Sequence, residues 1–283
     1  MRLLPRLPSI LFEPLVAAAL REDLGRAGDL TTDAIVPADA AAAGTIVARR
    51  SGCIAGLEVA RLAFLALDRR IEWQAEIEDG TVVGGGTALA RLAGPARALL
   101  TAERVALNFL GRLSGIATAT HSMVTAAESS SAAIVCTRKT TPGLRALEKY
   151  AVRAGGGGNH RFGLDDAVLI KDNHVVLAGG VAEAIARARK GVGHLVKIEV
   201  EIDDLGQLEE ALAGGVDAVL LDNFSLEDLC AAVALARERG VVTEASGGID
   251  PQTVAGVAAT GVDLISVGWL THSAPTLDVG LDL

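Results

Sequence analysis

Hydrophobic residues follow a helical spacing at the start of the chain and form short, repeated apolar runs further on. From Glu13 to Leu24 the apolar positions recur every three or four residues, which predicts a helix with one buried face. A strand near Gly44 to Arg49, a helix near Leu57 to Leu67 and an alternating strand near Ile71 to Ile77 are expected next. The first region is therefore predicted to mix helices and strands.

Two segments of this region are rich in turn-forming residues. The stretch from Gly28 to Pro37 contains glycine, aspartate, threonine and proline, which are expected to end the first helix. Gly84 to Gly86 lies between short β-like runs, with neither the Lys-Ser/Thr pair nor the helix start that a phosphate-binding loop needs. We therefore expect a hairpin turn there.

A long and mostly buried helix is predicted from Ala96 to Arg112, where apolar residues again recur at helical spacing. This helix carries Arg104. On the pattern alone, a solvated surface charge is a more common role for such an arginine than a place in a functional site.

After Gly115 the pattern changes to short aliphatic runs that alternate with helical segments, which is typical of parallel βα units. Ser225, and Asp250 followed by Pro251, are expected to start two of the helices. The repeat favours a barrel, complete or partly open, with functional groups at the carboxyl ends of the strands. The predicted strands are Ala133 to Thr137, Ala167 to Lys171, Leu195 to Glu201, Ala218 to Asp222, Val241 to Ser246 and Leu264 to Gly268.

One of these strands has a charged face. Lys197, Glu199 and Glu201 alternate with apolar residues, so the three share one side of the strand. Charges inside a barrel must be paired or functional, because burying an isolated ion is costly. An internal ion pair of Lys197 with Glu199 is as plausible as a functional role for these two, and Glu201, nearest the strand end, is the better candidate for function.

Composition and charge limit the classes of function. The 283 residues are 50% hydrophobic and 22% charged, which is typical of a globular protein. The formal net charge is -9, yet the stretch from Thr137 to His174 holds seven cations and four acids. A concentrated basic site in an acidic protein indicates a small polyanionic ligand. Because aromatic residues make up only 3%, a surface that stacks nucleic-acid bases is disfavoured.

Targeting and cysteine patterns point to the cytoplasm. Glu13 and Pro14 interrupt the apolar stretch near the N-terminus, so no export signal is predicted. No run of about 18 apolar residues is present, so no membrane-spanning helix is expected. The three isolated cysteines, which contain no C-x-x-C pair, fit reduced thiols better than disulfides or a zinc site.

Four cations are the main candidates for ligand binding. Arg138 and Arg161 present planar guanidinium groups that match carboxylate or phosphate, whereas Lys139 and Lys171 present mobile point charges. Together they suit two anionic groups. Glycines at the ends of later strands, in Ser246-Gly247-Gly248 and at Gly268, allow main-chain N–H groups to approach a phosphate.

Several of these segments resemble one known family over nearly the whole chain. They are REDLGRAGDLTT, AERVALNFLGRLSGIAT, TRKTTPGLRALEKYAVRAGGGGNHRFGLDDAVLIKDNH, KIEVE, LLDNF, EASGGI and SVGWLTHSAPTLD. The resemblance is to the quinolinate phosphoribosyltransferases, also called nicotinate-nucleotide pyrophosphorylases. It implies an N-terminal α/β sandwich domain over residues 1–114, with which a tail from 272 to 283 can pack, and an incomplete, TIM-like α/β barrel over residues 115–271.

The resemblance also implies a reaction, a cation and a set of binding roles. Phosphoribosyl pyrophosphate would transfer its phosphoribosyl group to quinolinate with loss of CO2, giving nicotinate mononucleotide and pyrophosphate in NAD synthesis, with Mg²⁺ carried by the pyrophosphate substrate. The active sites would be shared within a homodimer, or within a larger oligomer. The implied substrate-binding residues are Arg104, Thr137, Arg138, Lys139, His160, Arg161, Lys171, Glu201, Asp222, Ser246, Gly247, Gly248, Val267, Gly268 and Trp269.

Within this set the resemblance gives individual roles. The pyridine dicarboxylate would be held by Arg138, His160 and Arg161, with Lys171 beside it and Arg104 reaching in from the neighbouring subunit. Lys139 would face the pyrophosphate. Glu201 and Asp222 would bind ribose hydroxyls or magnesium-linked groups, and with the two lysines they form the implied catalytic set. Ser246 to Gly248 and Val267 to Trp269 would hold the 5-phosphate.

The chain departs from the family pattern at Trp269, where a small residue is expected, and this puts the geometry of the phosphate loop in question. Two other functions remain as alternatives. One is a molybdenum-transport-associated homologue of the same fold. That homologue is expected to lack the lysine of the LIKDNH segment, so the presence of Lys171 in this chain disfavours it. The other is a barrel aldolase that uses Lys171 as a Schiff-base lysine. A protein that binds anions without catalysis is a third reading.

Overall fold

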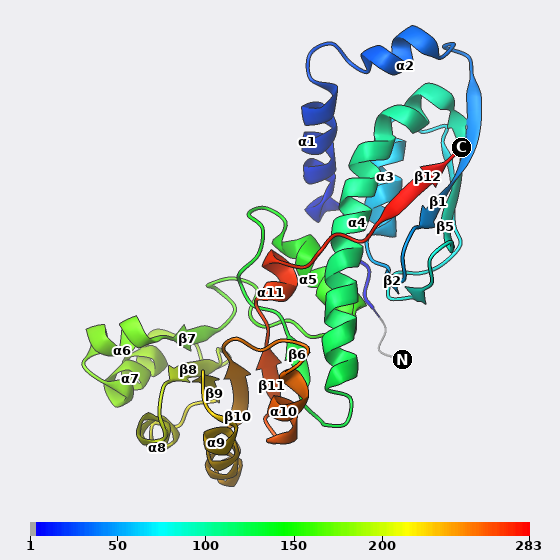
Figure 1. Cartoon of the computed structure of the whole chain (residues 1–283). Coiled ribbons are helices and arrows are strands. Elements are labelled where there is room, and N and C mark those ends of the chain that lie inside the picture. Colours follow the sequence, from blue (N-terminus) through cyan, green and yellow to red (C-terminus); the bar gives the residue numbers. More distant parts are fainter. Residues whose placement is uncertain (1–3) are drawn as a thin grey trace. The chain divides into compact units, whose positions relative to one another are not determined.

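A computed structural model describes residues 4–283 of the chain. The chain forms two compact units, and neither is one continuous stretch (Figure 1). The N-terminal unit holds the residues up to His121 together with Thr140–Gly156 and Leu270–Leu283. The barrel unit holds Ser122–Lys139 and Gly157–Trp269. The residue pair 114/115, where the sequence analysis places a boundary, lies inside one unbroken helix, α4 (Ala96–Ala126).

The N-terminal unit is built on a four-stranded antiparallel sheet with the order β12-β1-β5-β3. The C-terminal strand β12 pairs with β1, so the end of the chain completes this sheet. A separate two-stranded sheet contains β2 and β4. The elements of this unit are η1 (Ser9–Leu11), α1 (Glu13–Leu24), α2 (Leu30–Ile35), β1 (Ala41–Ala48), β2 (Gly52–Cys53), α3 (Leu57–Leu67), β3 (Glu72–Ala75), β4 (Val82–Val83), β5 (Ala88–Pro95), most of α4, α5 (Arg145–Ala154) and β12 (Val279–Asp282).

Amphipathic spacing accounts for two of these helices. Helix α1 has the predicted bounds and buries Val16 and Leu20 on one side. Helix α3 also has the predicted bounds, and its buried side includes Phe64. Helix α1 ends before the turn- and cap-forming segment, as expected, but this segment also starts a short helix that the sequence analysis did not predict. The Asp29 carboxylate accepts the main-chain N–H of Thr32 at 3.0 Å and so caps a further helix, α2.

The predicted hairpin at Gly84 to Gly86 is not formed. Strand β4 pairs with β2, whereas β5 pairs with β1 and β3, so the glycines connect two different sheets. The backbone here passes close to the segment that follows β1, because a Cβ added at Gly85 would lie 3.1 Å from the carbonyl oxygen of Arg49. The glycines thus allow a close approach of main chains.

The barrel unit has six parallel strands in the order β6-β11-β10-β9-β8-β7, with β6 and β7 at the two edges of the sheet in the described part of the chain. All six predicted strands are confirmed, and helices lie along one side of the curved sheet (Figure 1). The arrangement is a partial TIM-like barrel. Its elements are β6 (Ala133–Val135), β7 (Val168–Ile170), α6 (Asp172–Ala178), α7 (Val181–Gly191), β8 (Ile198–Ile202), α8 (Leu205–Ala213), β9 (Ala218–Asp222), α9 (Leu226–Glu238), β10 (Val242–Ser246), α10 (Val254–Ala259) and β11 (Leu264–Ser266). The short helix α11 (Trp269–His272) follows β11.

One of the two predicted helix starts in this unit is confirmed. The Ser225 hydroxyl accepts the main-chain N–H of Asp228 at 3.1 Å and caps α9. The other is misplaced. Asp250 accepts the main-chain N–H groups of Gln252 and Thr253, each at 2.9 Å, so it closes a turn, and α10 starts only at Val254.

Two further sequence expectations can be compared with the structure. None of the helices in residues 4–283 has the length and hydrophobicity needed to cross a lipid bilayer. Cys53, Cys136 and Cys230 form no disulfide in the described part of the chain.

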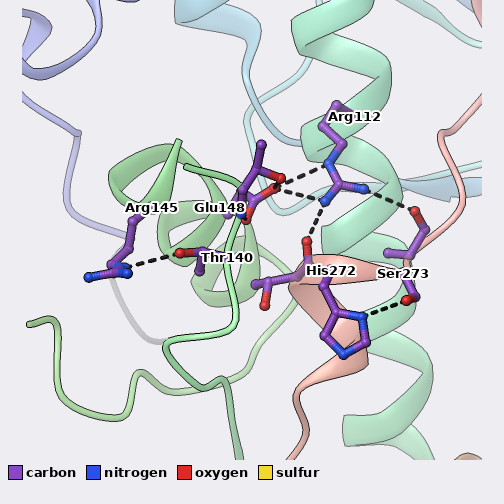
Figure 2. Close-up of polar contacts among 9 residues, drawn as sticks. Arg112, Thr140, Arg145, Glu148, His272 and Ser273 are labelled. Atoms are coloured by element: carbon purple, nitrogen blue, oxygen red, sulfur yellow. Dashed lines mark hydrogen bonds and ion pairs between the residues drawn. The ribbon is translucent and has the colours of Figure 1, made fainter. Parts of the chain in front are cut away.

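A buried ion pair joins three segments of the N-terminal unit (Figure 2). Glu148 on α5 is fully buried, and its carboxylate accepts Nη2 of Arg112 on α4 at 2.8 Å. The same carboxylate accepts the main-chain N–H of Thr141 at 3.0 Å and its hydroxyl at 2.8 Å. Arg112 also donates to the carbonyl oxygens of Thr271 and Ala274. Both charges are therefore satisfied by several partners, which is what burial requires.

Glu148→Ala is expected to lower the free energy of unfolding by about 3–5 kcal/mol, because Arg112 would keep its charge and lose its counter-ion. Urea unfolding followed by tryptophan fluorescence measures the change. Glu58→Ala is the matched control in the same unit, because Glu58 pairs with Arg61 on the exposed surface of α3. This control is expected to cost less than about 1 kcal/mol. Equal costs for the two variants would show that the buried pair adds no stability.

Candidate active site

The predicted site residues of the barrel unit gather at one edge of its sheet. Asp222 and Ser246 are in register at the carboxyl ends of β9 and β10. Lys171 directly follows β7, and Glu201 lies one residue before the end of β8. Because all six strands are parallel, their carboxyl ends meet at the same edge, where barrel enzymes place their functional groups. Thr137 to Lys139 and Val267 to Trp269 follow β6 and β11 and reach this edge as well.

Lys171 and Glu201 form an ion pair across neighbouring strands. Glu201 is mostly buried, with 14% of its side chain exposed, whereas 46% of the Lys171 side chain is exposed. The ammonium group therefore orients the carboxylate and remains accessible to an anion. Asp222 is oriented by its neighbour, since its carboxylate accepts the Asn223 side-chain amide at 2.7 Å.

Arg161 is held close to another cation. Its guanidinium donates to the carbonyl oxygen of Ala167 at 3.1 Å. Burial and, second, the charge of Arg138 lower the pKa of Arg161, while Glu199 and Asp166 oppose the shift. Two guanidinium groups that repel one another at a partly buried position favour binding of an anion between or beside them.

His160 is in contact with two carboxylates. Its Nε2 lies 2.9 Å from Glu199 and 3.4 Å from Glu244, and its Nδ1 accepts the main-chain N–H of Arg161 at 2.8 Å. Glu244 was not singled out from the sequence. The available signal was a single acidic residue in the middle of the predicted strand Val241 to Ser246, and the structure shows that this position is only 1% exposed.

The suggested ion pair of Lys197 with Glu199 is not formed. The Lys197 side chain is 78% exposed, and its ammonium group lies 2.6 Å from the carboxylate of Asp217. This carboxylate also accepts the main-chain N–H of Ile198. Lys197 precedes the first residue of β8, so it lies outside the strand that would have turned it inward. Glu199 instead faces His160.

The two glycine-containing segments form a compact main-chain surface. The carbonyl oxygen of Ser246 accepts the main-chain N–H of Asn223 at 2.9 Å, and a Cβ added at Gly247 would lie 2.1 Å from the Asn223 side chain. Gly247 and Gly248 both have positive φ, at 103° and 58°. Only glycine adopts such angles freely, and the exposed N–H groups of these turns suit a phosphate.

Trp269 does not disturb this surface. Its indole Nε1–H donates to the carbonyl oxygen of Ile249 at 3.1 Å, so the ring ties the segment after β11 to the segment after β10. The side chain that departs from the expected family pattern is thus a bridge between the two predicted phosphate-binding segments.

Two predicted residues remain to be placed. Lys139 is exposed, and its main-chain N–H donates to the Thr137 hydroxyl at 3.0 Å. Arg104 belongs to the N-terminal unit, where 64% of its side chain is exposed and Glu103 lies 3.7 Å away. It lines a hollow of about 490 Å³ together with Leu107, Asn108, Thr276, Leu277, Asp278 and Val279.

The barrel is open, and cations, carboxylates and glycine turns lie at its strand ends. This combination indicates an enzyme that binds phosphorylated, anionic substrates. Two family models narrow this class: the C-terminal domain of quinolinate phosphoribosyl transferase matches residues 116–282, and the N-terminal domain matches residues 29–114. The chain belongs to the quinolinate phosphoribosyl transferase family.

Curated relatives and a solved structure agree with this assignment. A probable nicotinate-nucleotide pyrophosphorylase [carboxylating] of Bacillus subtilis (strain 168) is 46% identical over 262 residues, covering 93% of this chain and 90% of that protein. The corresponding protein of Mycobacterium leprae (strain TN) is 46% identical over 277 residues and covers 95% of each chain. The crystal structure of NadC from Streptococcus pyogenes matches with a TM-score of 0.95 at 41% identity, over 99% of this chain and 98% of that chain.

Proposed function

We propose that the chain transfers the phosphoribosyl group of phosphoribosyl pyrophosphate to the ring nitrogen of quinolinate, with decarboxylation to nicotinate mononucleotide. The observation that carries this proposal is the cation set in the barrel unit, where Arg161 is held near Arg138 and Lys171 lies one strand from Glu201. Family membership supplies the reaction, since the relatives carry the name nicotinate-nucleotide pyrophosphorylase. The step belongs to NAD biosynthesis.

Arg138, His160 and Arg161 are assigned to the dicarboxylate, with Lys171 beside it, and Lys139 to the pyrophosphate. The 5-phosphate is assigned to the segments Ser246 to Gly248 and Val267 to Trp269. Catalysis in this arrangement comes from positioning and fixed charge, because the ring nitrogen must meet the anomeric carbon while pyrophosphate leaves. After transfer, the carbon–carbon bond to the 2-carboxylate breaks and CO2 leaves. The positive ring nitrogen stabilises the electron pair left on C2, and a proton from water then bonds to this carbon.

Mg²⁺ enters this proposal as part of the pyrophosphate substrate. Carboxylate oxygens are the ligands that Mg²⁺ prefers, and Glu201 and Asp222 supply such oxygens at the carboxyl ends of adjacent strands. Both carboxylates also suit ribose hydroxyls. We further propose a homodimer with shared active sites, located in the cytoplasm, that binds neither nucleic acid nor membranes.

Pyrophosphate release with quinolinate, phosphoribosyl pyrophosphate and Mg²⁺ tests the function, and nicotinate is the matched acceptor. Quinolinate is expected to be preferred by roughly 10- to 150-fold in kcat/KM, because nicotinate lacks one charge-assisted contact worth about 1.5–3 kcal/mol. Both acceptors release pyrophosphate, whereas only quinolinate releases CO2. Equal turnover of the two acceptors would contradict the dicarboxylate site, and no turnover of quinolinate would contradict the function.

A further inference from the structure

The hydrogen bonds of His160 define which of its ring nitrogens carries the proton. A main-chain N–H can only donate, and that of Arg161 points at Nδ1 from 2.8 Å. Nδ1 is therefore an unprotonated acceptor, and the proton of the neutral ring is on Nε2. This Nε2–H is directed toward Glu199 at 2.9 Å and Glu244 at 3.4 Å.

A histidine with two carboxylates within 4.8 Å of one another is also a common set of metal ligands. A ligating nitrogen must be free of its proton. Here Nε2 is the nitrogen that faces the carboxylates, and Nδ1 is already occupied by the Arg161 main chain. The arrangement therefore fits a hydrogen-bonded cluster better than a metal site.

This single N–H faces two carboxylates, and both carboxylates are buried. Glu199 is 9% exposed and Glu244 is 1% exposed. Neither oxygen of Glu244 makes a hydrogen bond of good geometry in the described part of the chain. Within its sheet Glu244 is in register with Leu220 and Leu264, which offer it no polar group. Two adjacent carboxylates in such surroundings cannot both be ionised without a large cost.

The charged and polar groups that face Glu244 come from strands β8 and β11 and from two segments outside the strands. Glu199 projects from β8, Lys171 follows β7, Ser266 lies on β11, and His160 precedes Arg161. Burial, followed by the charge of Glu199, raises the pKa of Glu244 to about 7, while His160, Ser266 and Lys171 oppose the shift.

We propose that His160, Glu199 and Glu244 form a positioning cluster for Arg161, in which Glu244 takes part as a neutral carboxyl group. The inference rests on the proposed function, because Arg161 is assigned there to the dicarboxylate. Glu199 holds the imidazole by a hydrogen bond, Glu244 lies 3.4 Å from the same ring nitrogen, and the imidazole accepts the main-chain N–H of Arg161. His160 thus contributes to substrate binding through its neighbour.

Ionisation of Glu244 is expected to lower the affinity for quinolinate. A carboxyl group with a raised pKa is neutral below about pH 7 and charged above it. The new negative charge would lie 3.4 Å from His160, which is itself assigned to the dicarboxylate and accepts the main-chain N–H of Arg161, so the affinity for the quinolinate dianion should fall as the pH rises. Phosphoribosyl pyrophosphate is assigned to Lys139 and the glycine segments, so its KM should change much less.

The experiment measures KM for both substrates between about pH 6 and pH 8.5. In the wild type, KM for quinolinate is expected to rise roughly three- to tenfold over this range. Glu244→Gln mimics the neutral carboxyl group and should keep the low value throughout. Glu209→Gln is the matched control, since it makes the same change on the exposed surface of α8 and should follow the wild type.

Three results would overturn the inference: a pH-dependent rise that persists in Glu244→Gln, a flat wild-type profile, or a Gln variant with high KM at every pH. If Glu244→Gln does not fold, nitrogen NMR of His160 in the wild type provides a second test. The Nε2–H tautomer at about pH 6 would support the cluster, and an imidazolium or Nδ1–H form would contradict it. This NMR test does not depend on turnover, so it separates failure of the cluster from failure of the proposed function.

Discussion

Lys139→Ala is expected to lower kcat/KM for phosphoribosyl pyrophosphate roughly 100- to 1,000-fold. An effect of this size is typical when one fixed group that stabilises developing charge is removed. The departing pyrophosphate gains negative charge in the transition state, and Lys139 is the cation assigned to it. Its main chain is fixed by the bond to Thr137, while its side chain is exposed to an incoming ligand. Quinolinate affinity, measured by calorimetry without the second substrate, should stay within about twofold of the wild type.

Lys197→Ala is the matched control for this variant. Lys197 is an exposed lysine of the same unit, and it pairs with Asp217 at the amino ends of β8 and β9, opposite the edge that holds the predicted site residues. Lys197→Ala removes one positive charge, as Lys139→Ala does, and should leave the use of both substrates unchanged. A quinolinate defect in Lys139→Ala, with normal use of phosphoribosyl pyrophosphate, would reverse the assignment of this lysine.

Sequence pattern was sufficient for the elements of the barrel because each strand is a short aliphatic run bounded by turn residues. Burial of such a run on both sides of a parallel sheet leaves few alternatives, and β9 has the predicted bounds. The common edge of Glu201, Asp222 and Ser246 follows from the same pattern, since polar residues that end parallel strands lie on one edge. The binding roles of the site residues came from the family resemblance and stay predictions.

Local signals failed at two places, of which one is decided by a local turn and the other by contacts between distant residues. Asp250 and Pro251 have the residue types of a helix start, but Asp250 binds the main chain of Gln252 and Thr253 in a turn. Gly84 to Gly86 has the composition of a hairpin, yet β4 pairs with β2. Strand partners are chosen by the whole fold, and a window of a few residues contains no information about them.

Glu244 shows a third kind of limit. Its sequence context identifies a buried strand, and a single acid within it has no defined partner until the strands are placed. His160 is 84 residues earlier in the chain, and only the fold brings the two together. Chemistry that depends on a pair of remote side chains is therefore found in the structure and missed in the sequence.

Each active site is proposed to be shared between the subunits of a two-fold symmetric dimer. When inactive Arg104→Ala chains are mixed with inactive Lys171→Ala chains, activity should then return to about a quarter of the wild-type value. Arg104 lies in the N-terminal unit and Lys171 in the barrel unit. In the proposed dimer, Arg104 of one subunit would serve the site that contains Lys171 of the other. Free exchange gives mixed dimers in about half of the population, and each mixed dimer holds one intact site and one doubly damaged site.

The measurement is pyrophosphate release after subunit exchange, with mixed dimers verified by two affinity tags. Arg104 is suited to such a role because its side chain is 64% exposed and lines a hollow of the N-terminal unit. Arg91→Ala, an exposed arginine of the same unit that pairs with Glu76, is the control and should be active without a partner. If verified mixed dimers are as inactive as their parents, Arg104 acts within its own chain or serves only as a helix charge, and the proposal of shared sites fails.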